Sequence, residues 1–303
     1  MQVFITGASG HIASAVIPEL LGAGHEVVGL ARSDAAAAAV EDLGAKVQRG
    51  SLDDVDSLRE AAAASDGVIH LAFKHDEMHL GNFGAAIAAD LRAKEAMGEA
   101  LAGTGKPFVG VSGTLALVLG GHQGTGTESD APGTGPQADG ENAVIALAGH
   151  GIRSSVVRLP PTVHSSLDHR GYVPALIDIA RAQGRAGYVG DGSNRWPAVH
   201  TLDAAHLLRL AVEQASAGSR LHAVADDGVP FREIAGAIGR HLGIPTVSIS
   251  PAEAEGYFGF LAMFVSLDNP ASSALTRELL GWQPEHAGLL DDLGEGHYFQ
   301  KQS

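Results

Sequence analysis

The first fourteen residues, MQVFITGASGHIAS, constrain the fold of this chain more than any other segment. An apolar run over residues 3–5 ends at Gly7, Gly10 and Ala13 follow, and an amphipathic stretch begins at Ile12. This order predicts a strand, a tight turn and a helix start that bind a dinucleotide. Gly7 lets the backbone turn, Gly10 lets it approach a pyrophosphate, and the helix N-terminus offers free N–H groups. The spacing G-x-x-G-x-x-A differs from the usual G-x-G-x-x-G. The prediction therefore rests on the position of these residues between a strand and a helix.

Composition limits the class of protein. The chain has 303 residues, 45% of them hydrophobic, which suffices for one large α/β domain or one domain with a smaller lobe. The net charge of −15 makes nucleic acid and anionic membranes improbable partners. No cysteine is present, which excludes a thiol nucleophile and a thiolate metal site. No apolar run reaches membrane-spanning length and the N-terminus lacks signal-peptide character, so we expect a cytoplasmic protein.

Strands and helices alternate through the first half. Strands are predicted over residues 27–30, 45–48, 67–72, 108–112 and 152–159, and helices over 35–43, 53–64 and 87–102. This alternation predicts an α/β fold with a Rossmann-type doubly wound parallel sheet, whose ligand crevice lies at the carboxyl ends of the strands. The segment 120–140 is predicted to be a long loop, which in a compact domain is functional or mobile.

We place a nucleotide-binding domain at residues 1–164, with part of 190–215 returning to it, and a smaller substrate lobe mainly at 165–303. Helices in the second part are predicted over 173–183, 204–214, 231–242 and 251–264, with Asp203 opening the second of them. The apolar run 257–265 is predicted to be core, with a lipophilic pocket or a dimer face as alternatives. The oligomeric state stays open between monomer and homodimer.

The end of the second strand indicates which dinucleotide binds. An NAD site usually has an acid there for the ribose 2′-OH, but this chain has Ala31, followed by Arg32 and Ser33. Arg32 can pair with a 2′-phosphate, so NADP is favoured and NAD is the alternative. Arg32 could instead be a solvated loop residue. Asp53 is predicted to meet the adenine amino group, and it could also cap a helix.

Further segments follow in a fixed order: TGASGHIA (6–13), Asp53, HLA (70–72), VSG (111–113), VRLP (157–160) and GDGSNRWPAVH (190–200). This ordered set resembles extended or atypical short-chain dehydrogenases/reductases of the NAD-dependent epimerase/dehydratase-like kind. The resemblance implies a nucleotide domain with a smaller C-terminal substrate lobe, and a small-molecule carbonyl or alcohol as substrate.

The turn, the strand ends and the resemblance together give the predicted cofactor site. Its residues are Gly7, Ser9, Gly10, His11, Ile12, Arg32, Ser33, Leu52, Asp53, Leu71, Ala72, Phe73, Lys74, Val111, Leu159, Pro160, Pro161 and Val163.

The chain departs from the family at the catalytic residues. Reductases of the family use a serine, and a tyrosine and a lysine spaced Y-x-x-x-K, in which the lysine lowers the pKa of the tyrosine. Ser112, or Thr114 beside it, stands at the serine position. Gly133 occupies the tyrosine position and Gln137 the lysine position, so the usual proton donor is absent.

Other residues are candidates for the missing function. Lys74 is expected near the nicotinamide ribose, where it would bind the ribose or donate a proton, although it could be a surface lysine. Tyr172 lies in the loop expected to face the substrate, as an acid or as an apolar wall with a polar tip. His164 and His169 are alternative acids. The catalytic candidates are therefore Ser112, Thr114, Lys74 and Tyr172.

Other chemistries are disfavoured. The segment from His75 to His79, with Asp76 and Glu77, provides no open coordination set, so no metal is expected. The sequence around Ser112 lacks the G-x-S-x-G elbow of a hydrolase.

The segment at 195–203 contains three residues of interest. By the resemblance, Arg195 matches the arginine that grips a substrate diphosphate in sugar-nucleotide enzymes. The preferred interpretation is a structural hinge between lobes, because few other basic residues surround it. His200 is expected to pack at the domain junction and Asp203 to cap a helix.

The sequence predicts an NADP(H)-dependent oxidoreductase that reduces an aldehyde or ketone. A nucleotide-sugar epimerase or dehydratase with bound NAD is the first alternative, but the missing Tyr–Lys pair and Ala31 weigh against it. A non-catalytic NADP-binding sensor is the second, and the missing pair favours it. A deep cavity beside the nicotinamide would distinguish an enzyme from a sensor.

Overall fold

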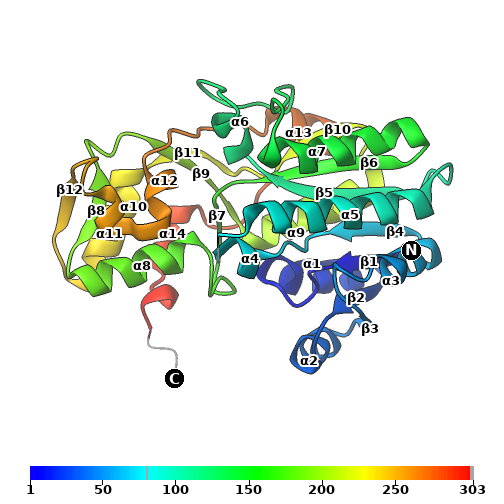
Figure 1. Ribbon diagram of the computed structural model, residues 1–303. Coiled ribbons are helices and arrows are strands. Elements are labelled where there is room, and N and C mark those ends of the chain that lie inside the picture. Colours follow the sequence, from blue (N-terminus) through cyan, green and yellow to red (C-terminus); the bar gives the residue numbers. More distant parts are fainter. Residues whose placement is uncertain (80, 301–303) are drawn as a thin grey trace.

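A seven-stranded parallel sheet forms the centre of the computed structural model, which describes residues 1–79 and 81–300 (Figure 1). The strand order is β10-β6-β5-β4-β1-β2-β3, and each adjacent pair runs parallel. Strand β1 lies between β2 and β4, so the order reverses there. Ligands of doubly wound sheets bind at such a switch point, outside the carboxyl ends of the strands.

The strands of this sheet are β1 (Gln2–Thr6), β2 (Glu26–Ala31), β3 (Lys46–Arg49), β4 (Gly67–His70), β5 (Pro107–Gly113), β6 (Arg153–Leu159) and β10 (Ser219–His222). The helices around it are α1 (His11–Gly22), α2 (Asp34–Asp42), α3 (Val55–Ala64), α4 (His75–His79), α5 (Phe83–Leu101), α6 (Leu115–Leu119), α7 (Pro136–Ala146), η1 (Leu147–His150), α9 (Thr201–Gln214) and α13 (Ala274–Leu280).

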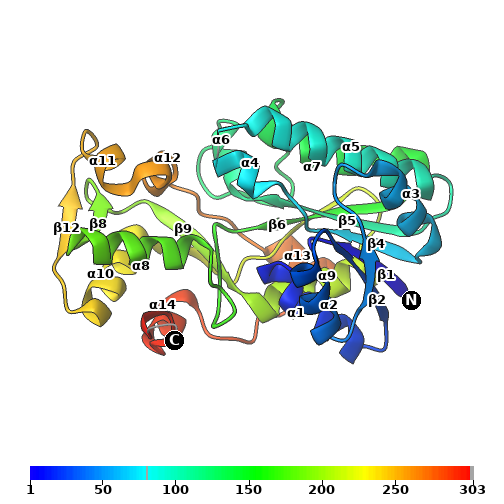
Figure 2. The same cartoon turned by 60° about the horizontal axis from the view of Figure 1, so that its bottom comes forward.

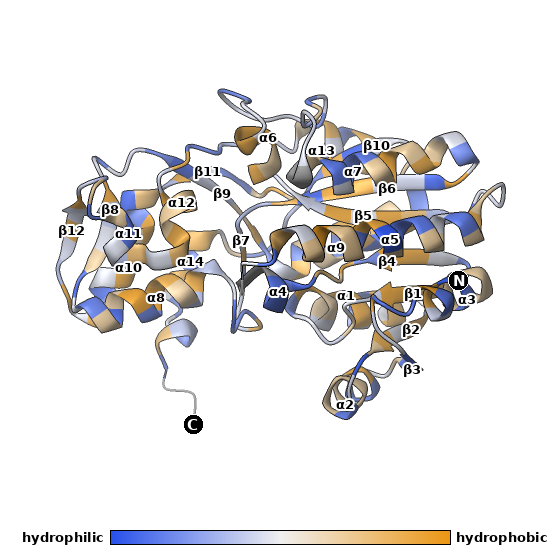
Figure 3. Cartoon of the chain, in the orientation of Figure 1, coloured by the Kyte–Doolittle hydropathy of each residue, from blue (hydrophilic) through white to orange (hydrophobic). Residues whose placement is uncertain are grey.

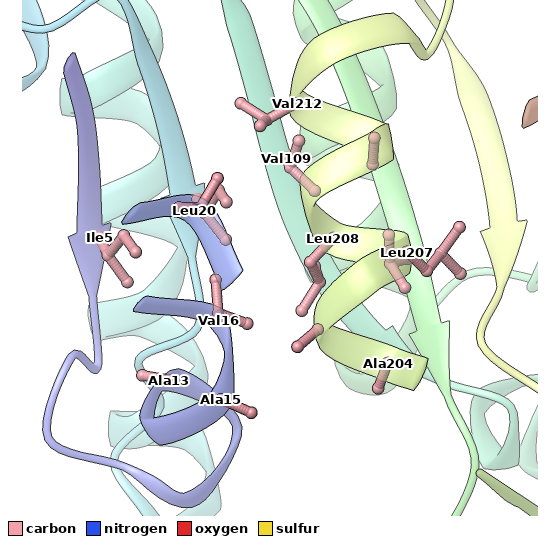
Figure 4. Close-up of a cluster of buried hydrophobic side chains, with 14 of the residues drawn as sticks. Ile5, Ala13, Ala15, Val16, Leu20, Val109, Ala204, Leu207, Leu208 and Val212 are labelled. Atoms are coloured by element: carbon pink, nitrogen blue, oxygen red, sulfur yellow. The ribbon is translucent and has the colours of Figure 1, made fainter. Parts of the chain in front are cut away.

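Two apolar cores hold helices on opposite faces of the sheet. On one face α1 packs beside α9, where Val16 and Leu20 meet Leu208 in a fully buried cluster (Figure 4). On the other face α3, α5 and α7 cover the sheet through a second cluster. Figure 3 shows hydrophobic residues along the central strands and mixed colours on the helices that cover them. The burial of apolar surface between the helices and the sheet makes the main favourable contribution to the free energy of folding.

A third apolar cluster lies beyond the carboxyl end of the sheet, at the left of Figures 1 and 2. Its strands are β7 (Thr162–His164), β9 (Arg195–His200) and β11 (Asp226–Pro230) in the order β11-β9-β7, and β8 (Ala186–Val189) paired with β12 (Thr246–Ile249). Its helices are α8 (Tyr172–Gln183), α10 (Phe231–Leu242), α11 (Ala254–Phe258), η2 (Gly259–Leu261), α12 (Ala262–Val265), α14 (Leu289–Gly294) and η3 (His297–Phe299).

The predicted α/β fold with a doubly wound parallel sheet is confirmed. Three local expectations are wrong. The helix expected over 251–264 is divided into α11, η2 and α12, because Gly259 adopts φ +56° at the break. The loop expected over 120–140 ends at Pro136, which is the first residue of α7, a position that proline favours. The side chain of His200, not that of Asp203, caps α9 by accepting from the Leu202 N–H.

No helix of the described ranges is long and apolar enough to cross a membrane.

Candidate dinucleotide-binding site

The turn between β1 and α1 lies at the switch point of the sheet. Gly7 has φ +71°, a backbone conformation that favours glycine. A Cβ at this position would also lie 2.8 Å from the Ala72 nitrogen, so there is no room for a side chain. Gly10 is the exposed N-cap of α1, and no side chain caps this helix. The first-turn N–H groups of α1 are therefore available to a phosphate. This geometry fits the pyrophosphate of a dinucleotide.

A buried polar network lies behind the turn. Thr6 Oγ1 accepts from the Ala72 N–H at 3.2 Å and lies 2.7 Å from His70 Nδ1. His70 Nε2 lies 2.9 Å from Asp90 Oδ1, and Lys94 Nζ donates to Asp90 Oδ2 at 2.6 Å. Burial lowers the pKa of His70, while His70 and Lys94 hold the pKa of Asp90 below its usual value despite burial. The network fixes the ends of β1 and β4 against α5.

Other predicted cofactor residues follow the carboxyl ends of neighbouring strands. These strand-end residues are half-buried, whereas the strands behind them are buried. They are Leu71, Ala72, Phe73 and Lys74 after β4, Val111 in β5, and Leu159 and Pro161 at the end of β6. Ser9 is exposed and His11 and Ile12 are half-buried in the turn, whereas Leu52, Pro160 and Val163 are buried. The parallel sheet brings all these segments to one edge.

Arg32 directly follows β2, with 71% of its side chain exposed. Its Nη2 donates to Asp76 Oδ2 at 2.8 Å. Ser33 caps α2 by accepting from the Ala36 N–H. Arg49 is the last residue of β3 and pairs in register with Ala31, the last residue of β2, so the two strands end at the same edge of the sheet. The guanidinium of Arg32 thus lies exposed at the end of β2, beside Asp76.

Asp53 is held by Lys74. The Lys74 ammonium lies 2.7 Å from each carboxylate oxygen of Asp53. Asp54 caps α3 by accepting from the Ser57 N–H, so the interpretation of Asp53 as the cap is wrong. Lys74 therefore faces the residue predicted to meet adenine, while its contact with the nicotinamide ribose stays a prediction.

The two hydroxyl candidates are engaged with protein groups. Ser112 hydrogen-bonds Glu141, and Arg158 also binds that carboxylate through two hydrogen bonds of 2.6 and 2.9 Å. Burial would raise the pKa of Glu141, but these partners hold it below its usual value. Thr114 is fully buried, and its Oγ1 accepts from Asn269 Nδ2 at 2.9 Å. Sequence patterns gave no signal for Asn269.

Tyr172 is the first residue of α8 and lies between aromatic rings. Its ring centroid lies 5.6 Å from that of Trp196 and 6.0 Å from that of Phe264. Burial raises the pKa of Tyr172, so the phenol stays protonated. The side chain thus has the character of an apolar wall with a polar tip.

The histidine candidates differ in environment. His164 is fully buried, and its Nδ1 lies 2.9 Å from Asp292 Oδ2. His169 is exposed in the loop before α8. Gly133 is exposed before α7, and the side chain of Gln137 lies outside the described residues.

The turn also contacts residues that sequence patterns did not identify. His11 Nε2 lies 2.8 Å from Thr201 Oγ1, at the start of α9, and His11 Nδ1 lies 3.8 Å from Asp168 Oδ1. Burial lowers the pKa of His11 and raises that of Asp168. The cofactor turn is therefore connected to the segment that leads into α8.

Two other residues of the 195–203 segment have structural partners. Arg195 binds both carboxylate oxygens of Asp268, at 3.0 and 2.8 Å, while its role as a hinge between lobes stays a prediction. Asp203 accepts from the backbone N–H groups of Glu285 and His286. It anchors the C-terminal segment against α9, where the sequence had suggested a helix cap.

His200 packs between the rings of two other histidines, His164 and His286. Its ring stacks on His286 at 4.7 Å, and burial together with His164 lowers the pKa of His200 to about 4.

The sequence suggested no metal site over 75–79, and the side chain of His79 lies outside the described residues. Elsewhere in the described chain, Asp292, Glu295 and His297 come close enough to share one ion. This group lies at α14 and η3.

Sequence comparisons identify a matching family and several relatives of this chain. The model of the NAD dependent epimerase/dehydratase family matches residues 3–224. An uncharacterized protein of Schizosaccharomyces pombe is 46% identical over 299 residues, which cover 99% of this chain and all of that protein. The 2-alkyl-3-oxoalkanoate reductase of Stenotrophomonas maltophilia is 30% identical, with 82% of this chain and 77% of that protein covered.

Solved structures agree in fold. DesIV, a dTDP-glucose 4,6-dehydratase of Streptomyces venezuelae solved with NAD and TYD bound, has a TM-score of 0.76 at 19% identity. The match covers 99% of this chain and 97% of that one. The chain therefore belongs to the NAD dependent epimerase/dehydratase family.

Proposed function

We propose that this protein is an NADP(H)-dependent oxidoreductase that reduces an aldehyde or ketone without a Tyr-x-x-x-Lys pair. The observation that carries the cofactor choice is Arg32, an exposed guanidinium at the end of β2, preceded by Ala31 where an acid would favour NAD. Gly7, Gly10 and the uncapped start of α1 would hold the pyrophosphate. When bound, the nicotinamide supplies the hydride.

The substrate class has support from a relative. The Stenotrophomonas maltophilia protein is named as a 2-alkyl-3-oxoalkanoate reductase, and the matched region covers most of both chains. We propose a small carbonyl compound as the substrate on this basis. We also propose that residues 1–164, with part of 190–215, bind the cofactor. Residues 165–303 would mainly bind the substrate.

Tyr172 is the preferred proton donor among the candidates. Lys74 is bound to Asp53, His164 is buried against Asp292, and Thr114 is buried beneath Asn269. Tyr172 retains a phenol whose raised pKa keeps it protonated at neutral pH. In this account the phenol donates its proton to the substrate oxygen, and the surrounding rings of the aromatic cluster exclude water.

A non-catalytic NADP-binding sensor is the second candidate. It is favoured by the same contacts, since Ser112, Thr114 and Lys74 are all engaged with protein groups. A nucleotide-sugar epimerase or dehydratase has less support, because Arg195 is bound to Asp268 and few basic residues surround it.

The test is a fluorescence titration with NADPH and NADH, followed by cofactor oxidation with a panel of aldehydes and ketones. The reductase proposal expects tighter NADPH binding and turnover with at least one carbonyl compound. NADPH binding without turnover on the whole panel would favour the sensor. Binding of neither cofactor would contradict both.

A further inference from the structure

The residues expected to recognise the adenosine half of the cofactor each face an opposite charge from one short segment. Arg32, expected at the 2′-phosphate, donates to Asp76, and Asp53, expected at adenine, accepts from Lys74. Lys74 ends the run that follows β4, and Asp76 lies in the first turn of α4. A segment of three residues therefore reaches both recognition groups.

The carboxylate of Asp76 resembles the ligand expected at Arg32. A carboxylate and a phosphate both offer oxygen acceptors to the planar fork of a guanidinium. Asp76 Oδ2 lies 2.8 Å from Arg32 Nη2, so the carboxylate occupies a donor that a 2′-phosphate would use. Resting on the proposed function, we infer that Asp76 is a specificity-determining residue that competes with the 2′-phosphate for Arg32 and so limits the preference for NADPH over NADH.

Because the Arg32 and Asp76 side chains are both exposed, Asp76 can compete for Arg32 without blocking it permanently. The side chains of Arg32 and Asp76 are 71% and 74% exposed, and exposed ion pairs contribute little free energy. A dianionic phosphate can therefore displace Asp76 from the guanidinium. NADPH binding must open this ion pair, whereas NADH brings no phosphate to Arg32 and leaves the pair intact.

The neighbouring pair has a parallel arrangement. Arg49 Nη2 donates to Asp34 Oδ1 at 2.7 Å, at the edge shared by β2 and β3. The 2′-phosphate region thus contains two guanidinium groups, each facing a carboxylate. Asp34 belongs to α2, whereas Asp76 belongs to the segment that also carries Ala72 and Phe73, which are predicted to line the cofactor. A shift of that segment on cofactor binding would move Asp76, but not Asp34.

Asp76→Asn tests the inference, because it keeps the shape and removes the charge. We expect the dissociation constant of NADPH to fall about two- to fivefold at low ionic strength, with that of NADH unchanged. Raising the salt concentration should reduce the difference, since both charges are exposed. The matched control is Asp178→Asn, which removes a carboxylate that is 75% exposed and pairs with Arg181 in α8. This control should leave both constants unchanged.

A double-mutant cycle with Arg32→Ala tests whether the effect of Asp76→Asn on NADPH binding depends on Arg32. The gain from Asp76→Asn should disappear in the Arg32→Ala background, and a gain that persists there would overturn the inference. An equal change for NADPH and NADH, or no change beyond that of the Asp178→Asn control, would overturn it as well. Failure of the wild-type protein to bind either cofactor would instead overturn the proposed function, together with this inference.

Discussion

His11 Nε2 lies 2.8 Å from Thr201 Oγ1, so the turn that follows β1 is joined to the first residue of α9, 190 residues later in the chain. The same hydroxyl lies 3.1 Å from the His164 carbonyl and accepts from Ser165 Oγ at 2.9 Å. The cofactor turn is thus fixed by the segment that leaves the sheet toward the third apolar cluster. The turn and that segment are therefore in direct contact through the Thr201 hydroxyl.

Gly10→Val should abolish binding of both NADPH and NADH. A Cβ at Gly10 would lie 3.1 Å from the Gly7 carbonyl oxygen, and the larger branched side chain would cover the free N–H groups of α1. Because Gly10 has φ −90°, valine fits the backbone and the fold should persist. Fluorescence titration checks the prediction, with Gly22→Val at the other end of α1 as control, where a Cβ meets nothing within 4 Å. Retained binding by Gly10→Val would mean that the turn does not hold the pyrophosphate.

Arg32→Ala should weaken NADPH much more than NADH, by about tenfold or more, because it removes a charge-assisted contact that only the 2′-phosphate makes. The measurement is the ratio of the two dissociation constants in the same buffer. Arg181→Ala, an exposed arginine in α8, is the control. Equal weakening of the two cofactors by Arg32→Ala would rule out the 2′-phosphate assignment.

Tyr172→Phe should lower kcat at least a hundredfold with little change in NADPH affinity, because it removes the proposed acid and keeps the ring between Trp196 and Phe264. Steady-state kinetics on an active carbonyl substrate provide the test. Tyr188→Phe, which alters another half-buried phenol, serves as the control. Unchanged kcat in Tyr172→Phe would show that the proton comes from another group.

Glu141→Gln should lower the free energy of unfolding by about 3 to 5 kcal/mol, because it leaves the fully buried Arg158 without its counter-charge. Urea unfolding at neutral pH measures this loss. The exposed Asp178→Asn change should have little effect by the same measurement. A small loss for Glu141→Gln would indicate that the Thr127 and Asp130 carbonyls, which also accept from Arg158, satisfy its charge.

Stability should fall as the pH drops from about 6.5 toward 4, and His222 should contribute to this. Burial, with Arg158, lowers the pKa of His222 to about 4 in the folded chain, below its ordinary value near 6.5. The unfolded state therefore binds the proton first, and stability is full above pH 6.5 and declines below it, by at most about 1.4 kcal/mol per pH unit for this group.

His222→Gln removes this titration while its amide can still accept from Arg158 and donate to the Ser272 carbonyl. Urea unfolding at several pH values should give a shallower pH dependence for His222→Gln than for the wild type. Replacing the exposed His150 by Gln should leave the slope unchanged. An identical slope in His222→Gln would contradict the contribution of His222.

The alternation of strands and helices was predictable because it depends on local periodicity and on glycine and proline positions. The first turn, the five strands that follow it in the sheet and α10 were identified in this way. The strand β10 was not, because its four residues include Arg220 and His222, whose partners make polar residues acceptable there.

Contacts in the candidate site were less predictable, because they join residues far apart in sequence. Asn269 and Thr114 are 155 residues apart, and no spacing or composition links them. The pairing of Lys74 with Asp53 joins the segments that follow β4 and β3, which β1 and β2 separate in the sheet. The sequence identified which residue types could act, whereas their partners required the three-dimensional arrangement.

Deuterium transfer tests the central claim most directly. The wild-type protein would be incubated with NADPH that carries deuterium at both C4 positions of the nicotinamide and with a carbonyl compound, and the alcohol would be analysed by mass spectrometry. The account predicts an alcohol that carries one deuterium on the former carbonyl carbon. Saturable NADPH binding with no deuterated product from any aldehyde or ketone would contradict it, and would identify the protein as a binder of the cofactor and not a reductase.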